Sequence, residues 1–298
     1  MNHNKKTKIV ATLGPSVNSK KLLKEILEAG VNVLRINFSH ANHDDVKNTI
    51  NIIKDLNNEF NYNAAILADL QGPKIRIGEV KGEYKVKKGD LICFKTGDKF
   101  ISTNNDFYMS YSNFAKDVTA GETVLIDDGK LIFEIISTNQ KDFVQAKAML
   151  DGVIRSNKGV NLPNTIISLP ALTDKDKADA IFAISQQVDW IALSFVRNSQ
   201  DLIELNTLIN THSDVKIPVI AKIEKPEAVQ AFDEIIQNCD GLMVARGDLG
   251  IEVPCEQVPL IQKKLVLKAK KNRIPIIIAT QMMESMMDSL TPSRAEVN

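Results

Sequence analysis

The sequence predicts an α/β protein with one parallel sheet and an inserted β-rich segment. Seven short apolar, β-branched runs alternate with helical patterns, and the helical period disappears between residues 71 and 157. Strands that alternate with helices are typical of parallel sheets, and strands without a polar face are typical of sheets covered by helices. Seven such strands fit either a (β/α)8 barrel or a doubly wound sheet.

The predicted strands share an apolar centre and a polar end. They are residues 8–12, 31–37, 65–69, 190–195, 219–224, 241–245 and 274–280. The helical patterns between them cover residues 20–29, 45–57, 174–187, 201–211 and 226–237. Because the carboxyl ends of parallel strands meet on one side of a barrel, their polar ends are the first place to search for a site.

The segment from Gln71 to about Asn157 follows the third strand. It shows alternating patterns at residues 83–94 and 123–136, with turn signals at Gly89 and Gly129. We therefore expect a barrel domain formed by residues 1–70 and 158–298, and a small all-β domain formed by residues 71–157.

The composition excludes several classes of partner. Lys plus Arg and Asp plus Glu each number 37, so the chain lacks the basic excess typical of proteins that bind nucleic acid or acidic membranes. No apolar run approaches the roughly 18 residues needed to cross a bilayer, and the apolar stretch near the N-terminus is too short for a signal peptide. Cys93, Cys239 and Cys255 lie too far apart in sequence to indicate a zinc site or a disulfide framework. We expect a soluble, cytoplasmic protein.

Polar residues end the second predicted strand. Arg35, Asn37 and Ser39 alternate along it and therefore point the same way. An Arg guanidinium suits a phosphate, and amide and hydroxyl oxygens suit a hard cation. The alternative is that these residues only mark the start of a loop.

The fifth, sixth and seventh strands bring further groups to the same edge. Lys222 and Glu224 share one face of the fifth strand, the sixth leads through Gly247 to Asp248, and the seventh ends at Thr280. Two carboxylates are a sparse oxygen set of the kind that binds Mg²⁺ together with substrate and water. Free backbone N–H groups around Gly247 would suit an anion. Lys222 and Glu224 could instead form a structural ion pair. A functional site explains better than an ion pair why polar groups lie at the same end of several strands.

Four methionines near the C-terminus have helical spacing. They are Met282, Met283, Met286 and Met287. Because methionine fills irregular gaps in cores, we expect them to pack in the interior.

Eight motifs follow one another along the chain, and none is specific by itself. They are TKIVATLGPS (7–16), LRINFSH (34–40), DLQGPKIR (69–76), DDGK (127–130), KGVNLP (158–163), AKIEKP (221–226), MVARGDLGIE (243–252) and ATQMMESM (279–286). In this order, around an insertion after the third strand, they resemble the motif series of pyruvate kinases from residue 7 to the last residue.

The resemblance implies a TIM (β/α)8-type barrel with a lid-like inserted domain. It also implies a glycolytic, Mg²⁺-dependent reaction in which phosphoenolpyruvate gives its phosphoryl group to ADP, yielding pyruvate and ATP. Arg35 would bind the substrate phosphate, and Lys222 would stabilise charge on the transferring group and the enolate. Glu224 and Asp248 would hold Mg²⁺. Thr280 would lie beside the carbon that becomes the methyl group.

Further roles follow from the resemblance. The backbone around Gly247 and Asp248 would bind the carboxylate of phosphoenolpyruvate. Arg76 and Lys158 resemble nucleotide-phosphate contacts of the family, and His40 is a further candidate for this role. Family members are usually homotetramers, so the resemblance implies a homo-oligomer for the full-length form.

The chain departs from the family pattern at a monovalent-cation site. Many members hold K⁺ with residues that match Asn37, Ser39, Asp69 and the carbonyl of Leu70. Those enzymes read TKGPEIRT after the aspartate, whereas here the run is LQGPKIRI, with Lys74 in place of the glutamate. This resembles the branch that works without K⁺. The Lys74 ammonium is a tethered monovalent cation that could fill the pocket. It could also point to solvent.

The chain stops at Asn298, within the run TPSRAEVN. We therefore expect an incomplete barrel, without the family's eighth strand and C-terminal domain. Two other readings remain open at this point. One is a Mg²⁺-dependent aldolase-type barrel that handles pyruvate or oxaloacetate, and the other is an inactive, truncated relative retained for binding.

Overall fold

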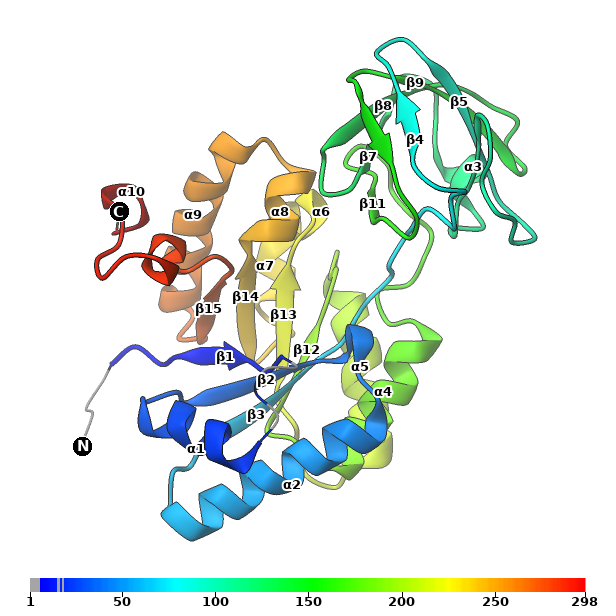
Figure 1. The fold of residues 1–298 in the computed structure, drawn as a ribbon. Coiled ribbons are helices and arrows are strands. Elements are labelled where there is room, and N and C mark those ends of the chain that lie inside the picture. The colour runs from blue at the N-terminus through cyan, green and yellow to red at the C-terminus, as the bar shows by residue number, and fades with distance from the viewer. Residues whose placement is uncertain (1–5, 15–16, 18, 298) are drawn as a thin grey trace.

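The computed structural model describes residues 6–14, 17 and 19–297, apart from the side chain of His40. Its main sheet contains seven strands in the order β1-β2-β3-β12-β13-β14-β15, and all of its pairings are parallel (Figure 1). These are β1 (Val10–Thr12), β2 (Val33–Asn37), β3 (Ala65–Asp69), β12 (Trp190–Leu193), β13 (Val219–Ile223), β14 (Gly241–Ala245) and β15 (Ile276–Ala279). Every predicted strand is present. Since neighbours in the sheet follow sequence order without reversal, the sheet is a curled, incomplete barrel and not a doubly wound sheet.

Helices cover the outer face of this sheet, and further short helices and turns follow the ends of its strands (Figure 1). They are α1 (Lys20–Glu28), α2 (His43–Phe60), α4 (Asp174–Ser185), α5 (Ser199–His212), α6 (Pro226–Gln230), α7 (Phe232–Ile235), α8 (Arg246–Glu252), α9 (Val258–Lys271) and α10 (Arg294–Val297), with short 3-10 turns η1 (Phe38–His40), η2 (Cys255–Gln257) and η3 (Glu284–Met287). Capping boxes start α4 at Thr173 and α5 at Asn198. The predicted helix over 226–237 is divided at Ala231 into α6 and α7.

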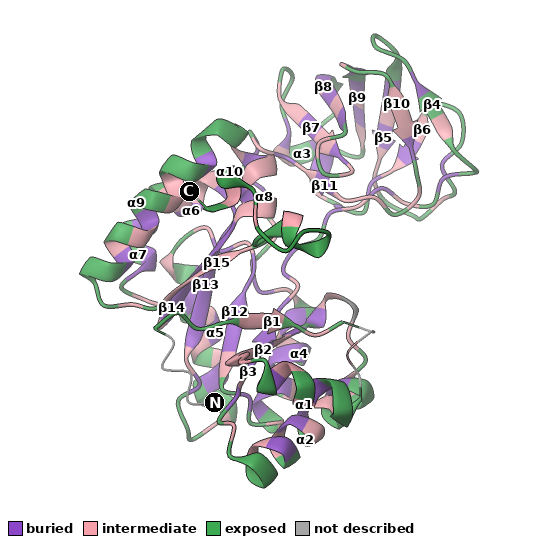
Figure 2. Cartoon of the chain, turned by 60° about the vertical axis from the view of Figure 1, so that its left-hand side comes forward, coloured by how far each residue is buried: buried purple, intermediate pink, exposed green. Residues whose placement is uncertain are grey.

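Strand alternation divides the apolar side chains of the sheet into two layers. One set, which includes Leu34, Ala221 and Ile223, packs against the helices. The other set lies inside the barrel and includes Leu67 and Ile220. Strands β13 and β14 are therefore buried along their whole length, whereas α9 exposes its outer side (Figure 2).

The β-module, defined here as strands β4 to β11, forms a separate body beside the barrel (Figure 1). It contains a six-stranded sheet in the order β11-β7-β8-β9-β5-β6 and a two-stranded sheet of β10 and β4. The strands are β4 (Tyr84–Val86), β5 (Leu91–Lys95), β6 (Asp106–Tyr108), β7 (Thr123–Ile126), β8 (Leu131–Thr138), β9 (Phe143–Ala148), β10 (Gly152–Ile154) and β11 (Val160–Asn161), with the short helix α3 (Phe114–Asp117). Its apolar cluster runs from Ile75 to Ile167 and is separate from both clusters of the barrel. The chain enters and leaves the module side by side, because Arg76 pairs with Gly159 and the Ile77 amide donates to the Lys158 carbonyl at 2.9 Å.

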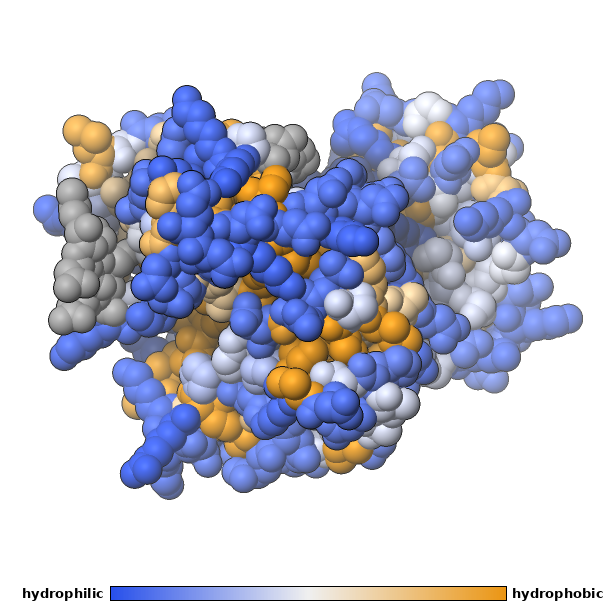
Figure 3. All heavy atoms as spheres, turned by 90° about the horizontal axis from the view of Figure 1, so that it is seen from below, coloured by the Kyte–Doolittle hydropathy of each residue, from blue (hydrophilic) through white to orange (hydrophobic). Residues whose placement is uncertain are grey.

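The expectation that the four methionines pack in a core is wrong. Met282, Met283, Met286 and Met287 are 57%, 37%, 46% and 79% exposed, respectively. They lie in and before η3, and among the described residues none of the four is buried. Elsewhere on the surface, apolar side chains gather in patches between charged ones on the lower face (Figure 3). Within the described residues, no helix combines the length and apolar character needed to cross a membrane.

Candidate active site

A polar layer lies above the inner apolar layer of the barrel. On five strands, the residue two positions after an inner apolar side chain is polar and shares its face; these residues are Thr12, Arg35, Asp69, Ser194 and Lys222. On β14 and β15 the equivalent residues are Ala245 and Ala279, which are paired in register. The barrel therefore changes from apolar to polar towards the carboxyl ends of its strands, and two of these strands contribute only small side chains there.

Lys222 is the centre of this layer. Its ammonium nitrogen donates to Ser194 Oγ at 2.7 Å and lies 3.0 Å from Glu224 Oε1 and 3.2 Å from Asp69 Oδ1. Its side chain is 8% exposed. Burial acts to lower the pKa of Lys222, but the charges of Glu224 and Asp69 outweigh burial and raise this pKa above its ordinary value. The side chain is therefore a permanent cation.

Asp69 connects Lys222 to Arg35. Arg35 donates to Asp69 Oδ2 through Nε at 2.7 Å and also through Nη2. Its Nη1 donates to Thr12 Oγ1 at 3.0 Å. The Arg35 side chain remains 21% exposed, whereas Asp69 is buried. The guanidinium is thus fixed in orientation by Asp69 and Thr12 and remains partly exposed to an anion from solvent.

Glu224 carries the buried carboxylate of the site. Its Oε2 accepts a hydrogen bond from the Phe195 amide at 2.8 Å. Glu224 Oε1 and Asp69 Oδ1 are both buried, and each is ion-paired with the Lys222 ammonium group. Burial raises the pKa of Glu224 against the opposing charge of Lys222, and Asp248 raises it further. A buried carboxylate near a second carboxylate fits the preference of Mg²⁺ for oxygen ligands.

Asp248 and Thr280 are connected through Gly247. A Cβ atom at Gly247 would lie 3.1 Å from Thr280 Cγ2, so this glycine permits the close approach of α8 to the end of β15. Arg246 adds to the contact, because its Nη2 donates to the Thr280 carbonyl. Asp248 lies in the first turn of α8, close enough to raise the pKa of Glu224.

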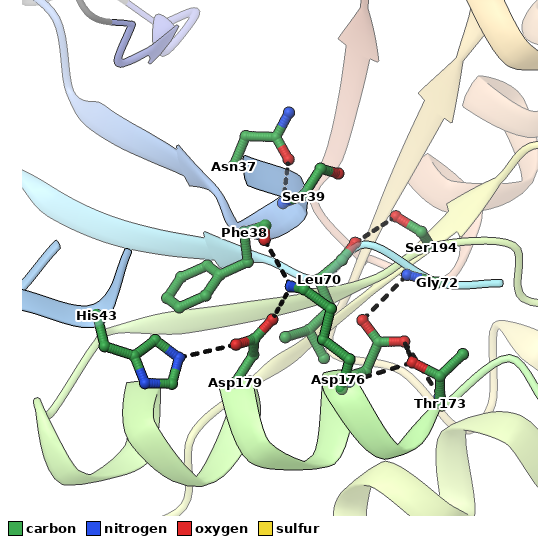
Figure 4. Close-up of polar contacts among 11 residues, drawn as sticks. Asn37, Phe38, Ser39, His43, Leu70, Gly72, Thr173, Asp176, Asp179 and Ser194 are labelled. Atoms are coloured by element: carbon green, nitrogen blue, oxygen red, sulfur yellow. Dashed lines mark hydrogen bonds and ion pairs between the residues drawn. The ribbon is translucent and has the colours of Figure 1, made fainter. Parts of the chain in front are cut away.

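The residues of the predicted monovalent-cation pocket lie at the ends of two neighbouring strands, where Asn37 pairs in register with Asp69. Figure 4 shows the Asn37 side chain accepting from the Ser39 amide at 3.0 Å. The Leu70 carbonyl accepts from Ser194 Oγ at 2.6 Å (Figure 4). The loops that carry these residues are thus defined by local hydrogen bonds.

Helix α4 supports both of these loops from below (Figure 4). Lys175 donates to the Phe38 carbonyl at 2.8 Å, and the buried Asp176 accepts from the Gly72 amide at 3.0 Å. Asp179 lies 2.5 Å from Lys175 Nζ and 2.8 Å from His43 Nε2. The helix that follows the β-module in sequence therefore holds the loops after β2 and β3.

Three of the remaining predicted residues lie in a cleft of about 540 Å³ that is lined mostly by residues 71–110. Ser39, Lys74 and Arg76 line this cleft. No ion pair joins Lys74 to Asp69 in the described part of the chain. Partial burial and then the charge of Arg76 lower the pKa of Lys74, while Asp248 acts in the opposite direction.

Lys158 forms its ion pair within the β-module, where its ammonium group lies 2.9 Å from Asp127. The side chain of His40 lies outside the described part of the structure. Among the described residues, no group of three or more His, Cys, Asp or Glu side chains is arranged to hold a metal ion. Any divalent ion bound at Glu224 and Asp248 would therefore need ligands from substrate and water.

Comparison with known proteins identifies the family. Residues 4–298 match the family model described as pyruvate kinase, barrel domain. The chain belongs to the pyruvate kinase family. It is 44% identical to pyruvate kinase 2 of Synechocystis sp. over 99% of this chain and 50% of that relative. It is 41% identical to the pyruvate kinase of Clostridium perfringens over 98% of this chain, and 42% identical to that of Corynebacterium efficiens over 99%, with 62% of each relative covered. The chain thus spans about half to three-fifths of the length of these relatives. The predicted family is confirmed, and the aldolase-type reading is not supported.

Two residues of this pyruvate kinase barrel were not predicted as part of the site. Ser194 contacts both Lys222 and the Leu70 carbonyl, and Thr12 contacts Arg35. A signal was present for both, since each is a polar residue at the carboxyl end of a predicted strand. Asp176 gave no comparable signal, because it reads as an ordinary helix-capping residue.

Proposed function

We propose that this chain carries the catalytic site of a pyruvate kinase, which transfers phosphoryl from phosphoenolpyruvate to ADP and yields pyruvate and ATP. The observation that supports this most directly is the buried Lys222 ammonium, surrounded by Glu224, Asp69 and Ser194 at the carboxyl end of the barrel. Phosphoryl transfer depends on positioning and charge stabilisation more than on covalent catalysis. A fixed, buried cation supplies both.

In this proposal the bond between phosphorus and the enol oxygen breaks as a bond to a terminal oxygen of ADP forms. Arg35, oriented by Asp69, binds the phosphate of the substrate. Lys222 stabilises the charge on the transferring group and on the enolate oxygen that remains. The methylene carbon of the enolate then takes a proton and becomes the methyl group of pyruvate, and Thr280 lies beside this carbon.

Glu224 and Asp248 would hold Mg²⁺, and the backbone at Gly247 and Asp248 would bind the substrate carboxylate. The burial of Glu224 and the nearby charge of Asp248 support the metal assignment. When bound, the ion neutralises charge on the phosphoryl and carboxylate oxygens.

We also propose the division into a barrel domain (1–70 and 158–298) and a lid (71–157). Strand β11 lies just beyond this boundary in sequence, but it pairs with β7 and its Val160 packs in the apolar cluster of the β-module. Arg76, Lys158 and His40 would contact the nucleotide phosphates. The position of Arg76 in the cleft supports its role, whereas Lys158 would have to exchange Asp127 for a phosphate. Closure of the lid would exclude water that competes for the phosphoryl group.

We further propose that Lys74 supplies the positive charge for which many relatives use K⁺ at Asn37, Ser39, Asp69 and the Leu70 carbonyl. The support is its position in the cleft, within electrostatic reach of Asp248. We expect the enzyme to act as a cytoplasmic homo-oligomer.

Replacement of Lys222 tests the function. Lys222→Met should lower turnover by about a thousandfold or more, because it removes the main stabilising charge. The control is Lys263→Met on the exposed side of α9, and the thermal midpoint of each variant reports folding. Turnover is followed as ATP formation in a coupled assay, alongside an assay for carbon–carbon cleavage. Near-normal turnover of Lys222→Met would contradict the assigned role. Wild-type protein that binds phosphoenolpyruvate with Mg²⁺ in calorimetry but shows no turnover would indicate an inactive relative.

A further inference from the structure

A hydrogen bond joins the β-module to the barrel on the side where the chain returns from the module. Asn161 Nδ2 donates to Glu252 Oε1 at 2.8 Å. Asn161 belongs to β11, and both of its neighbours, Val160 and Leu162, are buried in the cluster of the β-module. Glu252 is the last residue of α8, whose Leu249 is buried in the cluster of the barrel. The bond therefore connects two residues that are each fixed in a different core.

Glu252 also holds a buried cation. Lys225 Nζ lies 2.8 Å from Glu252 Oε1, and the two side chains are 6% and 1% exposed. The other oxygen, Oε2, is buried and has no hydrogen-bonding partner in the part of the chain that the structure describes. A desolvated carboxylate that has few donors loses more from the removal of one of them than a solvated carboxylate does. Removal of the Asn161 amide should therefore cost more free energy than the loss of a hydrogen bond at the surface.

The two barrel partners of this link are close in sequence to the proposed metal ligands. Lys225 directly follows Glu224, and Glu252 lies four residues after Asp248 on the same short helix. A displacement of β11 that lengthens the Asn161–Glu252 bond would therefore act on both segments. The segment that leads from the barrel into the β-module is fixed by a different kind of contact. There the backbone amide of Gly72 donates a hydrogen bond to the buried side chain of Asp176.

We infer that Asn161, Glu252 and Lys225 form a latch that couples the position of the β-module to the divalent-metal site of the barrel. The three residues are positioning residues, since none of them is placed against substrate. With the latch formed, α8 and the segment after β13 hold Asp248 and Glu224 at a fixed separation. When the module moves and the latch opens, this separation is released and metal affinity falls. The inference rests on the proposed function only for the identity of the metal site.

The test uses the full chain with substitutions at Asn161. Asn161→Ala removes the donor, and Asn161→Asp places a second carboxylate against Glu252. The double variant Asn161→Asp/Glu252→Gln restores an amide–carboxylate pair with the roles exchanged. Gln145→Ala is the control, because it truncates a half-buried amide of the same module at β9. Hydrogen–deuterium exchange of residues 246–252 is measured together with the binding of Mn²⁺ alone, followed by electron paramagnetic resonance.

Asn161→Ala should speed exchange in 246–252 and weaken Mn²⁺ binding by about 3- to 30-fold, the range expected for a residue that couples two sites. Asn161→Asp should do more, and the double variant should recover most of the loss. A merely structural role would not produce this recovery. The inference is overturned if Asn161→Ala matches Gln145→Ala in both measurements, or if the double variant is no better than Asn161→Asp. Exchange is independent of turnover, so an inactive wild type would refute the proposed function and leave the test of the latch intact.

Discussion

Ser194 Oγ accepts a hydrogen bond from Lys222 Nζ at 2.7 Å and donates its own proton to the Leu70 carbonyl at 2.6 Å. One hydroxyl thus fixes the central cation of the site to the backbone of the loop after β3. All three groups are buried. Because a buried donor or acceptor without a partner is costly, this serine determines where the ammonium group lies.

Ser194→Ala tests this arrangement. Loss of the hydroxyl leaves the Leu70 carbonyl without its side-chain donor and lets Lys222 move towards Glu224. We expect the free energy of unfolding to fall by about 1–3 kcal/mol and turnover to fall by about 10- to 100-fold, because small displacements of a catalytic group have large effects on rate. Ser185→Ala on the surface of α4 is the control. Loss of stability with unchanged turnover would show that the serine supports only the fold.

Gly247→Ala should impair the site by crowding Thr280. The new Cβ would lie 3.1 Å from Thr280 Cγ2, so the Thr280 side chain must give way by a few tenths of an ångström. We expect turnover to fall by about tenfold or more. The double variant Gly247→Ala/Thr280→Ser lacks the crowded methyl group, and its turnover should exceed that of Gly247→Ala. If the double variant is the slower of the two, contact with Cγ2 is not the cause of the defect.

Lys74→Glu should make activity depend on K⁺. The wild type should keep most of its rate in buffer without K⁺ or NH₄⁺, because the Lys74 ammonium supplies the charge. The variant should lose about 10- to 100-fold in that buffer, as expected when a stabilising charge is removed, and should regain rate with KCl. Initial rates over a KCl titration check this. A wild type that is slow without K⁺ would refute the proposed role of Lys74.

The ion pair of Asp127 with Lys158 should make stability depend on pH. The hydrogen bond from Lys158, followed by that from Lys130, lowers the pKa of Asp127 below its ordinary value of 3.8. A carboxyl group with a lowered pKa in the folded state stabilises the fold above pH 3.8, and this contribution is lost as the pH falls through the lowered pKa.

Lys158→Ala should therefore raise the pKa of Asp127 towards 3.8 and reduce the free energy of unfolding at pH 7. Because Lys158 is partly exposed, we expect a loss of only about 0.3–1 kcal/mol. Urea unfolding at pH 7 and near pH 2 gives the comparison, and an NMR titration gives the pKa. An equal loss at both pH values would exclude this ion pair as its cause.

The strands of the barrel were predictable because each is a short apolar run bounded by polar residues. Their polar ends leave the sheet earlier than predicted, so β12 ends at Leu193 and Ser194 lies in the following loop. The methionine segment was mispredicted because helical spacing does not report burial. Whether a residue such as Met287 is covered depends on elements far away in sequence, and in the part of the chain that the structure describes it is 79% exposed.

Side-chain alternation within a strand correctly placed Lys222 and Glu224 on one face. It could not show that Asp69 joins Lys222 to Arg35, because this contact depends on the register between β2, β3 and β13. Nor could it show the support from α4, since Asp176 and Gly72 are separated in sequence by the whole inserted segment. Contacts between distant segments are set by the closed fold and leave no local pattern.

The chain leaves for the β-module and returns from it at one point, where Arg76 and Gly159 face each other as a bridged pair. A barrel with a short turn between these two residues would keep every strand of its main sheet. The module has its own apolar cluster. Its removal or replacement would therefore change the loop-closure entropy of the barrel only slightly.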